Sequence, residues 1–339
     1  MNLPAPSVGI GILNWNGKKF LQSLLPELRN ISYSNFTIYV IDNNSTDDSI
    51  TYIRQYHPNV KLIELDRNYG FAEGYNKGFA QMDEDYYLMM NSDVETPATF
   101  IEPLVEMMEA DPAIAICQPK LLSLLHPDLL EHGGAAGGMI DILGYPFCRG
   151  RIFESSEKDK GQYTKPAPIF WASGACCLIR KEAYKKINGM YKFFFMHSEE
   201  IDMCWRFIAE GYKIMYCPDS YIYHLGGGTL AYKSPHKTYL NFRNNIIMCF
   251  RNSPWYVNLW LLPVRMGLDL IAAFRFLIAE DSANSKAVFV AYKDFIKWLA
   301  TEKNKFPAKK KSLLSIPVVL HNSIVWQHYI KEVRYYGEL

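Results

Sequence analysis

Tyr87-Leu88-Met89-Met90-Asn91-Ser92-Asp93 is an apolar run that stops on a carboxylate. Residues 85–90 are mostly apolar and aromatic and too few for a helix, so they are predicted to form a buried strand. Asn91, Ser92 and Asp93 would then lie at its carboxyl end, the edge where open parallel α/β sheets bind ligands. Because Mg²⁺ and Mn²⁺ prefer oxygen ligands, the segment predicts a divalent-cation site, and a solvated turn explains the same residues equally well.

The segments around this strand alternate between strand and helix. Strands are predicted at 7–14, 36–41, 61–65 and 113–117, and helices at 18–29, 45–56, 72–82 and 97–110. We expect Ser45 or Thr46 to cap the second of these helices and Pro97 to open the last. Alternation with short connections predicts an α/β fold with a doubly wound, mostly parallel sheet flanked by helices.

The remaining chain divides at about residue 230. Residues 119–167 are predicted to be loops, followed by a strand or hairpin at 169–179, helices at 181–187 and 198–210, and strands at 213–217 and 221–225. Beyond residue 230 the pattern is helical, with helices expected at 239–250, 255–279, 286–303 and 312–335. The expected domains are therefore 1–230 and a helical extension, 231–339.

Composition places the chain among globular proteins. It has 339 residues, of which 49% are hydrophobic, enough for a substantial core. The net charge of +1 hides an acidic body, with 20 basic and 28 acidic residues in 1–230, and a basic tail, with 16 and 7 in 231–339. Seven cysteines without a CxxC pair, and a start without an export signal, predict a cytoplasmic protein. The basic residues form no recognisable nucleic-acid motif.

Two loops are candidates for binding a nucleotide. Asp42 ends the second strand, where a carboxylate commonly reads a base or ribose, although Asp42 and Asn44 could equally shape a turn. The glycines of residues 68–78 lie where a strand passes into a helix, so backbone N–H groups could approach a diphosphate. The same glycines, Gly70, Gly74 and Gly78, share one helix face and could instead permit close packing.

Candidate acids follow an aromatic segment at 193–195. Glu199, Glu200 and Asp202 would lie in the first turn of a helix that Ser198 caps, an arrangement that the helix dipole alone favours. The aromatic residues would also desolvate a carboxyl group and raise its pKa, which suits a general base. Arg206, four residues after Asp202, is expected to pair with it. His224, before Gly226-Gly227-Gly228, is either structural or a ligand to the same cation as Asp93.

Taken in order, these segments resemble the family 2 inverting glycosyltransferases with the GT-A fold, in particular rhamnosyltransferase-like bacterial members that build surface polysaccharides. The resemblance covers roughly residues 7–230 and rests on stretches 12–17, 40–47, 68–78, 90–93, 173–175, 199–206 and 224–227. Singly these motifs are weak, but the ordered set is highly specific.

The resemblance implies roles for individual residues. Asp42 would contact a pyrimidine base, and Asp93, with His224 as a further ligand, would bind Mg²⁺ or Mn²⁺ against the diphosphate. Glu200 aligns with the catalytic base, where the family usually has Glu-Asp and this chain has Glu199-Glu200. The residues expected to hold the nucleotide are Asn14, Asp42, Asn44, Asn68, Gly70, Gly74, Asn76, Asn91 and Ser92.

The implied reaction is an inverting transfer of a sugar, rhamnose or another hexose, from a UDP- or dTDP-sugar to a glycan or lipid-linked acceptor. Residues 255–279 are long and apolar but interrupted by charges, so we expect a helix in the membrane interface at the inner face of the cytoplasmic membrane. A helical bundle or a homodimer interface explains this segment about as well. The alternatives for the whole chain are a non-catalytic subunit of a polysaccharide assembly, either sugar-nucleotide-binding or a scaffold, and a nucleotidyltransferase.

Overall fold

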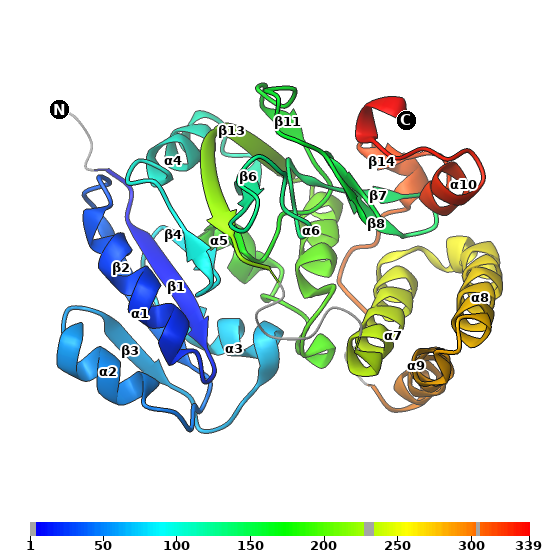
Figure 1. The fold of residues 1–339 in the computed structure, drawn as a ribbon, viewed down its shortest axis with the longest axis horizontal. Helices are drawn as coiled ribbons and strands as arrows, with labels where there is room; N and C mark the ends of the chain where they lie inside the picture. The colour runs from blue at the N-terminus through cyan, green and yellow to red at the C-terminus, as the bar shows by residue number, and fades with distance from the viewer. Residues whose placement is uncertain (1–4, 227–233, 303–305) are drawn as a thin grey trace.

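The computed structural model describes residues 5–226, 234–302 and 306–339, and its core is one large mixed sheet (Figure 1). The strand order is β11-β13-β6-β12-β4-β1-β2-β3, and β5 pairs with β13. The strands are β1 (Val8–Asn14), β2 (Phe36–Asp42), β3 (Lys61–Glu64), β4 (Tyr86–Met90), β5 (Val94–Glu95), β6 (Ile114–Ser123), β11 (Ala167–Pro168), β12 (Cys176–Arg180) and β13 (Lys213–His224). β1 to β4 pair in parallel, as do β6 and β13, whereas β5, β11 and β12 run antiparallel to their neighbours.

Helices cover both faces of this sheet and are α1 (Lys18–Glu27), α2 (Ser49–Tyr56), α3 (Gly70–Phe79), α4 (Ile101–Ala110), α5 (Lys181–Lys186) and α6 (Glu199–Ala209). All five residues of β4 are buried, and they alternate between two apolar cores. Tyr87 and Met89 face the core that contains α3 and α6, and Leu88 and Met90 face the core of α1 and α4. A strand covered on both faces needs apolar residues throughout, which explains the unbroken apolar run. The fold is the mostly parallel, helix-flanked sheet expected from the sequence.

The prediction of loops over 119–167 is right only in part, because the region also contains strands. β6 continues to Ser123, and a second sheet of order β10-β9-β8-β7-β14 is formed by β7 (Gly138–Asp141), β8 (Pro146–Cys148), β9 (Arg151–Ile152), β10 (Ser155–Ser156) and β14 (Val319–Leu320). These strands have two to four residues, which is too short to show a periodic pattern.

The C-terminal part begins as predicted, with α7 (Pro235–Asn252), α8 (Trp255–Ile278) and α9 (Ser282–Thr301). The single helix predicted over 312–335 is wrong, since β14 and the short helix α10 (Ile324–Tyr329) occupy that region. Pro317 cannot continue a helix, and Val319 instead pairs in parallel with Ile140 of β7. None of the helices in the described ranges is both long and apolar enough to cross a membrane. The domain boundary at 230 stays a prediction, and it lies, like Gly227 and Gly228, outside the described residues.

Two predictions about helix starts are also wrong, and a third is right in position only. α2 begins at Ser49 after Asp48, while Ser45 Oγ accepts a hydrogen bond from the backbone of Asn16 (2.9 Å). α4 begins at Ile101, four residues after Pro97. Ser198 does precede α6, but its φ is 70° and its side chain makes no capping hydrogen bond. In the first and last cases a tertiary constraint replaces the local cap.

Candidate active site

Asn14 and Asp42 form a buried pair at the carboxyl edge of the sheet. The parallel register of β1 and β2 places them side by side, and Asn14 Nδ2 donates to Asp42 Oδ2 (2.8 Å). The other oxygen, Asp42 Oδ1, accepts from the backbone N–H of Ser45 (2.8 Å). Asp42 thus anchors the turn that follows β2. Asn44, two residues later, is exposed and has a φ of 64°.

The turn before α3 is held by Asn43, which sequence reasoning missed. The Asn43 side chain is buried, donates to Asn68 Oδ1 (3.0 Å) and the carbonyl of Gly70 (3.0 Å), and accepts from the N–H of Tyr69 (2.9 Å). Asn68 Oδ1 also accepts from the N–H of Gly70 (2.8 Å). The run of polar residues after β2 indicated that this loop makes hydrogen bonds. It did not indicate which residue of the loop faces α3.

The glycines of α3 have different surroundings. Gly70 has a φ of +74°, and a Cβ there would lie 2.6 Å from the carbonyl oxygen of Phe195, so only glycine fits. The first helical N–H groups, of Phe71 and Ala72, already donate to that carbonyl (2.6 and 3.3 Å). Gly74 and Gly78 pack against Leu13 and Ile41, as the close-packing interpretation expects. In this structure the start of α3 therefore contacts the loop before α6.

Asn76 lies apart from these groups. Its Oδ1 accepts from Tyr184 Oη (2.7 Å) and the N–H of Met190 (2.8 Å), and its Nδ2 donates to the carbonyl of Met190 (2.9 Å). The side chain helps to line a cavity of about 850 Å³ with Glu73 and Tyr184. The structure thus does not bring Asn76 to the edge where Asp42 lies.

Asp93 and His224 do come together, because β5 pairs with β13. Val94 lies opposite His224 in that pairing, and the N–H of Leu225 donates to the carbonyl of Asp93 (3.0 Å). His224 Nε2 is 3.2 Å from Asp93 Oδ1 and 3.3 Å from Asn91 Nδ2. A Cβ on Gly17 would lie 3.7 Å from Ser92 Oγ, so Ser92 borders the turn after β1.

Glu131 completes this cluster and was not predicted. Its Oε1 is 3.5 Å from His224 Nδ1, on the side of the ring opposite Asp93. Burial lowers the pKa of His224, but Asp93 and Glu131 outweigh burial and raise it to about 10. Glu131 reaches the site through β6, which lies beside β13, because its N–H donates to the carbonyl of Leu121 (2.9 Å). Glu131 lies in a segment with no strand pattern, so no sequence pattern indicated its position.

Glu199 and Glu200 begin α6; Glu199 is buried, and Glu200 is half-buried with its Oε2 atom shielded from water. Burial and the neighbouring Glu200 raise the pKa of Glu199 well above its ordinary value, and burial raises the pKa of Glu200 to about 7. The Oε2 atoms of both residues have no hydrogen-bond partner within the described ranges. A shielded, unpaired carboxyl oxygen with a pKa near neutrality is suited to accept a proton from a ligand.

The loop before these acids is strained and held by α7. Phe195, His197 and Ser198 all have positive φ values, of 63°, 70° and 70°. Asn244 on α7 is fully buried and donates to the carbonyls of Phe194 (3.0 Å), Met196 (2.8 Å) and His197 (2.7 Å). Such strain persists only when the surroundings impose it. α7 therefore fixes the chain that presents Glu199 and Glu200.

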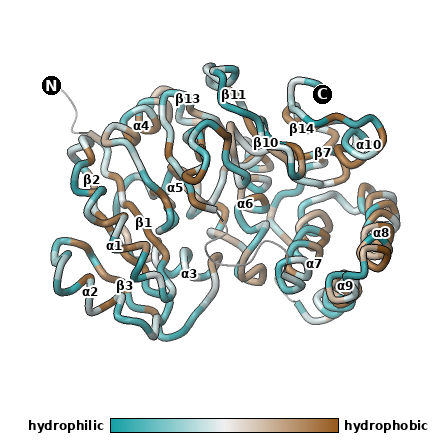
Figure 2. The backbone as a smooth tube through the Cα atoms, viewed as in Figure 1, coloured by the Kyte–Doolittle hydropathy of each residue, from teal (hydrophilic) through white to brown (hydrophobic). Residues whose placement is uncertain are grey.

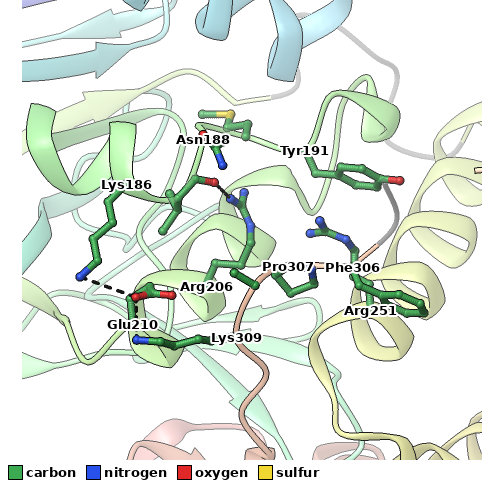
Figure 3. A pocket seen from close by; sticks show the side chains of 12 residues that line it. Lys186, Asn188, Tyr191, Arg206, Glu210, Arg251, Phe306, Pro307 and Lys309 are labelled. Carbon is green, nitrogen blue, oxygen red and sulfur yellow. Dashed lines mark hydrogen bonds and ion pairs between the residues drawn. The ribbon is translucent and has the colours of Figure 1, made fainter. Parts of the chain in front are cut away.

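Asp202 has a different environment from the two glutamates. It pairs with Arg206 (Oδ2 to Nε, 2.8 Å), which confirms the predicted ion pair, and with Arg251 of α7. Figure 3 shows the two arginines beside a cavity of about 530 Å³, where Glu210 lies near Lys186 and Lys309. None of the predicted site residues lines this cavity. Asp202 is accordingly a structural member of the acidic cluster.

Comparison with known proteins identifies the family. The model of "Glycosyl transferase family 2" matches residues 9–188. The chain is 25% identical over 258 residues to N-acetylglucosaminyl-diphospho-decaprenol L-rhamnosyltransferase of Mycobacterium tuberculosis, covering 70% of this chain and 81% of that protein. It is 24% identical to a low-salt glycan biosynthesis hexosyltransferase of Haloferax volcanii, covering 71% and 74%.

Solved structures share the fold. GalNAc-T7 with UDP, GalNAc and Mn²⁺ superposes with a TM-score of 0.60 at 14% identity, over 88% of this chain and 58% of that one. A mannosyltransferase of Pyrobaculum calidifontis in complex with GDP-Man and Mn²⁺ gives 0.52 at 14%, over 86% and 88%. The fold is therefore GT-A-like. Since the family model matches more than half of the residues, the chain belongs to glycosyl transferase family 2, as its ordered motifs predicted.

Proposed function

We propose that this protein is an inverting glycosyltransferase that moves a hexose from a UDP- or dTDP-sugar to a glycan or lipid-linked acceptor in cell-surface polysaccharide synthesis. The observation that carries the proposal is the pair of shielded carboxyl groups, Glu199 and Glu200, whose Oε2 atoms lack hydrogen-bond partners in the described structure. The name of the mycobacterial relative supports rhamnose as the sugar and a diphospho-lipid as the carrier of the acceptor. The proposed location is the cytoplasm, at the inner face of the membrane, where a lipid-linked acceptor could be reached.

The chemistry assigned to this site is one in-line displacement. Glu200 takes the proton of an acceptor hydroxyl while that oxygen attacks the anomeric carbon of the donor sugar. The bond from that carbon to the nucleoside diphosphate breaks at the same time, so the anomeric configuration inverts. No covalent enzyme intermediate is required, in contrast to retaining enzymes with a carboxylate nucleophile. Asp42 and the turn that it shares with Asn14 would border the nucleotide.

Asp93 and His224 are the proposed ligands for Mg²⁺ or Mn²⁺. A carboxylate and an imidazole lying 3.2 Å apart fit such a cation once His224 releases its Nε2 proton, because both groups can then donate to one ion. Among the described residues no group of three His, Cys, Asp or Glu side chains is arranged to hold a metal. The remaining ligands would therefore be phosphate oxygens and water, as is usual for Mg²⁺. When bound, the cation would neutralise charge on the departing diphosphate.

Removing Asp93 should abolish metal-dependent nucleotide binding. Asp93→Ala leaves His224 as the sole proposed protein ligand, so we expect the affinity for UDP or dTDP in the presence of Mn²⁺ to fall by about 100-fold or more. Loss of a group that only supports a ligand usually lowers metal affinity by about 10–100-fold, and loss of a ligand should cost more. Isothermal calorimetry with UDP, dTDP and GDP, with and without Mn²⁺, measures this. Glu95→Ala, two residues away on an exposed position, is the matched control. If the wild-type chain binds no nucleotide in any condition, the scaffold alternative replaces the transferase.

Glu131 should orient His224 for the metal. Glu131→Gln removes the charge that faces Nδ1, so we expect Mn²⁺ affinity to fall by about 10–100-fold, the usual effect of losing a carboxylate behind a ligating histidine. Titration of Mn²⁺ followed by electron paramagnetic resonance measures the affinity independently of catalysis. Glu154→Gln, in an exposed position of the same connection, should have no effect. An unchanged affinity in Glu131→Gln would assign Glu131 to stability alone.

A further inference from the structure

α8 exposes many apolar side chains and buries two of its three charged ones. Trp255, Leu259, Phe274 and Ile278 are 73%, 69%, 63% and 70% exposed, and Phe289 and Ile296 of α9 continue the surface at 52% and 65%. These six residues define the α8–α9 face. The two helices lie at the outer edge of the molecule in Figure 1, and brown, apolar segments mark α8 in Figure 2. Soluble monomers rarely expose an apolar patch of this extent without a partner.

The opposite side of α8 holds an ion pair inside the protein. Arg265 and Asp269 are 2% and 1% exposed and lie 3.6 Å apart. Arg265 Nη1 donates to the carbonyl of Leu143 (2.9 Å), and Asp269 accepts from the hydroxyl groups of Tyr145 (2.9 Å) and Tyr292 (2.6 Å). A helix that faces water has the reverse arrangement, with its charges outside. The sequence of α8 is thus suited to an apolar environment on its outer side.

The exposed charges near this face are almost all positive. Within residues 255–301, all of which the structure describes, the exposed charged side chains are Arg275, Lys286, Lys293 and Lys297 and a single acid, Glu280 in the turn between the helices. An apolar surface bordered by cations complements an anionic lipid interface, where apolar side chains enter the acyl region and Lys and Arg meet the headgroups. Symmetric pairing with a second copy would bring two surfaces with the same positive charge together.

We propose that the α8–α9 face docks on the surface of a membrane that contains anionic phospholipid. The face connects to the catalytic acids through α7, since α8 follows α7 directly and Asn244 of α7 fixes the loop before Glu199. Docking would therefore hold Glu199 and Glu200 at a set distance from the lipid surface. The docking itself does not depend on the proposed function. Only the reason for docking rests on it, because a lipid-linked acceptor is presented at such a surface.

Vesicle flotation of the full chain tests the proposal. We expect the protein to float with vesicles of phosphatidylcholine plus phosphatidylglycerol and to bind vesicles of phosphatidylcholine alone more weakly. Phe274→Ser with Ile278→Ser should lower partitioning by at least about tenfold, since each change removes several buried CH₂ groups. Lys293→Gln and Lys297→Gln should each lower binding to the anionic vesicles by about fivefold. Leu125→Ser, an exposed leucine elsewhere (66%), is the control that should bind as wild type.

The possible results distinguish docking on a membrane from pairing with a second copy, and they are independent of the transferase assignment. Wild-type protein that stays unbound with anionic vesicles overturns the proposal. A dimer in sedimentation velocity that Phe274→Ser with Ile278→Ser dissociates, without vesicle binding, overturns it in favour of a second copy. The same variant should keep the nucleotide affinity and the melting temperature of the wild type, so a loss of flotation is not a loss of folding. Nucleotide binding, measured without lipid, tests the proposed function separately.

Discussion

Glu200→Gln should lower the rate of sugar transfer by about 10²–10⁴-fold, the contribution that a general base usually makes. Glutamine has nearly the same shape but cannot take the proton of the acceptor hydroxyl, so nucleotide affinity should be unchanged. Transfer from labelled UDP- or dTDP-sugar measures the rate, and calorimetry measures the affinity. Glu199→Gln is the matched comparison, because it alters the adjacent acid, whose Oε2 atom also lacks a partner among the described residues. A larger loss in Glu199→Gln would make Glu199 the base, and full activity in Glu200→Gln would revive the non-catalytic scaffold.

The pH dependence of transfer follows from the raised pKa of Glu200. Only the ionised carboxylate can accept a proton, and burial raises its pKa to about 7. In the wild type, kcat/KM for the acceptor should therefore fall about tenfold for each unit of pH below 7 and level off above it. With an ordinary glutamate, whose pKa is near 4.5, kcat/KM would not change with pH over most of this range. The residual activity of Glu200→Gln should lack this inflection.

The same substitution should make the fold more stable at alkaline pH. A carboxyl group whose pKa is raised on folding binds its proton more tightly in the folded state. The stability that this proton contributes to the folded state is lost as pH rises from about 4.5 to about 7. The shift corresponds to about 3 kcal/mol in the free energy of unfolding. Relative to wild type, Glu200→Gln should gain stability above neutral pH and lose that gain in acid. Thermal unfolding across pH measures this, and a stabilised but inactive variant excludes misfolding as the cause of inactivity.

The central sheet and part of the proposed metal site could be predicted from local sequence patterns. The all-apolar run of β4 and the alternation of strands and helices gave the sheet, and the order Met90 to Asp93 followed by His224 gave two members of the proposed metal site. These residues are adjacent to strand ends, and the carboxyl ends of parallel strands must meet at one edge. The assignment of Asp93 and His224 to one cluster therefore required only the topology. Their chemical role stays a prediction.

Long-range packing determined what the sequence did not predict. Glu131 reaches His224 from an irregular connection, and Asn43 and Asn244 act through buried hydrogen bonds to backbone groups that no spacing rule indicates. β14 exists because β7 offers an edge to pair with, although 179 residues separate Val319 from Ile140. The start of α3 contacts Phe195 rather than an open edge, because the loop before α6 folds back over it. A pattern in the sequence cannot show which distant backbone group will occupy a position.

Asp202 holds α6, the helix of the proposed catalytic acids, against α7. It is fully buried, and its Oδ1 accepts from Arg251 and from Asn252 Nδ2 (2.8 Å) of α7, while Oδ2 accepts from Arg206. Arg206 also donates to the carbonyls of Ile187 (2.8 Å) and Gly189 (2.7 Å). Burial opposes ionisation of Asp202, but Arg251 and Arg206 outweigh it and hold the pKa below its ordinary value. One carboxylate thus joins α6, α7 and the turn after α5.

Asp202→Asn should lower the free energy of unfolding by about 3–5 kcal/mol, because it removes a buried carboxylate charge that pairs with two buried guanidinium groups. Urea denaturation at neutral pH measures the loss. Glu64→Gln, which breaks the exposed pair of Arg54 and Glu64 (2.6 Å), is the control and should cost at most about 1 kcal/mol. A cost in Asp202→Asn as small as that of the control would show that the other contacts of the two arginines, not Asp202, compensate their charge. Because Asp202 lies one helical turn after Glu199, the same variant should also slow transfer, through a displaced α6 rather than a lost proton acceptor.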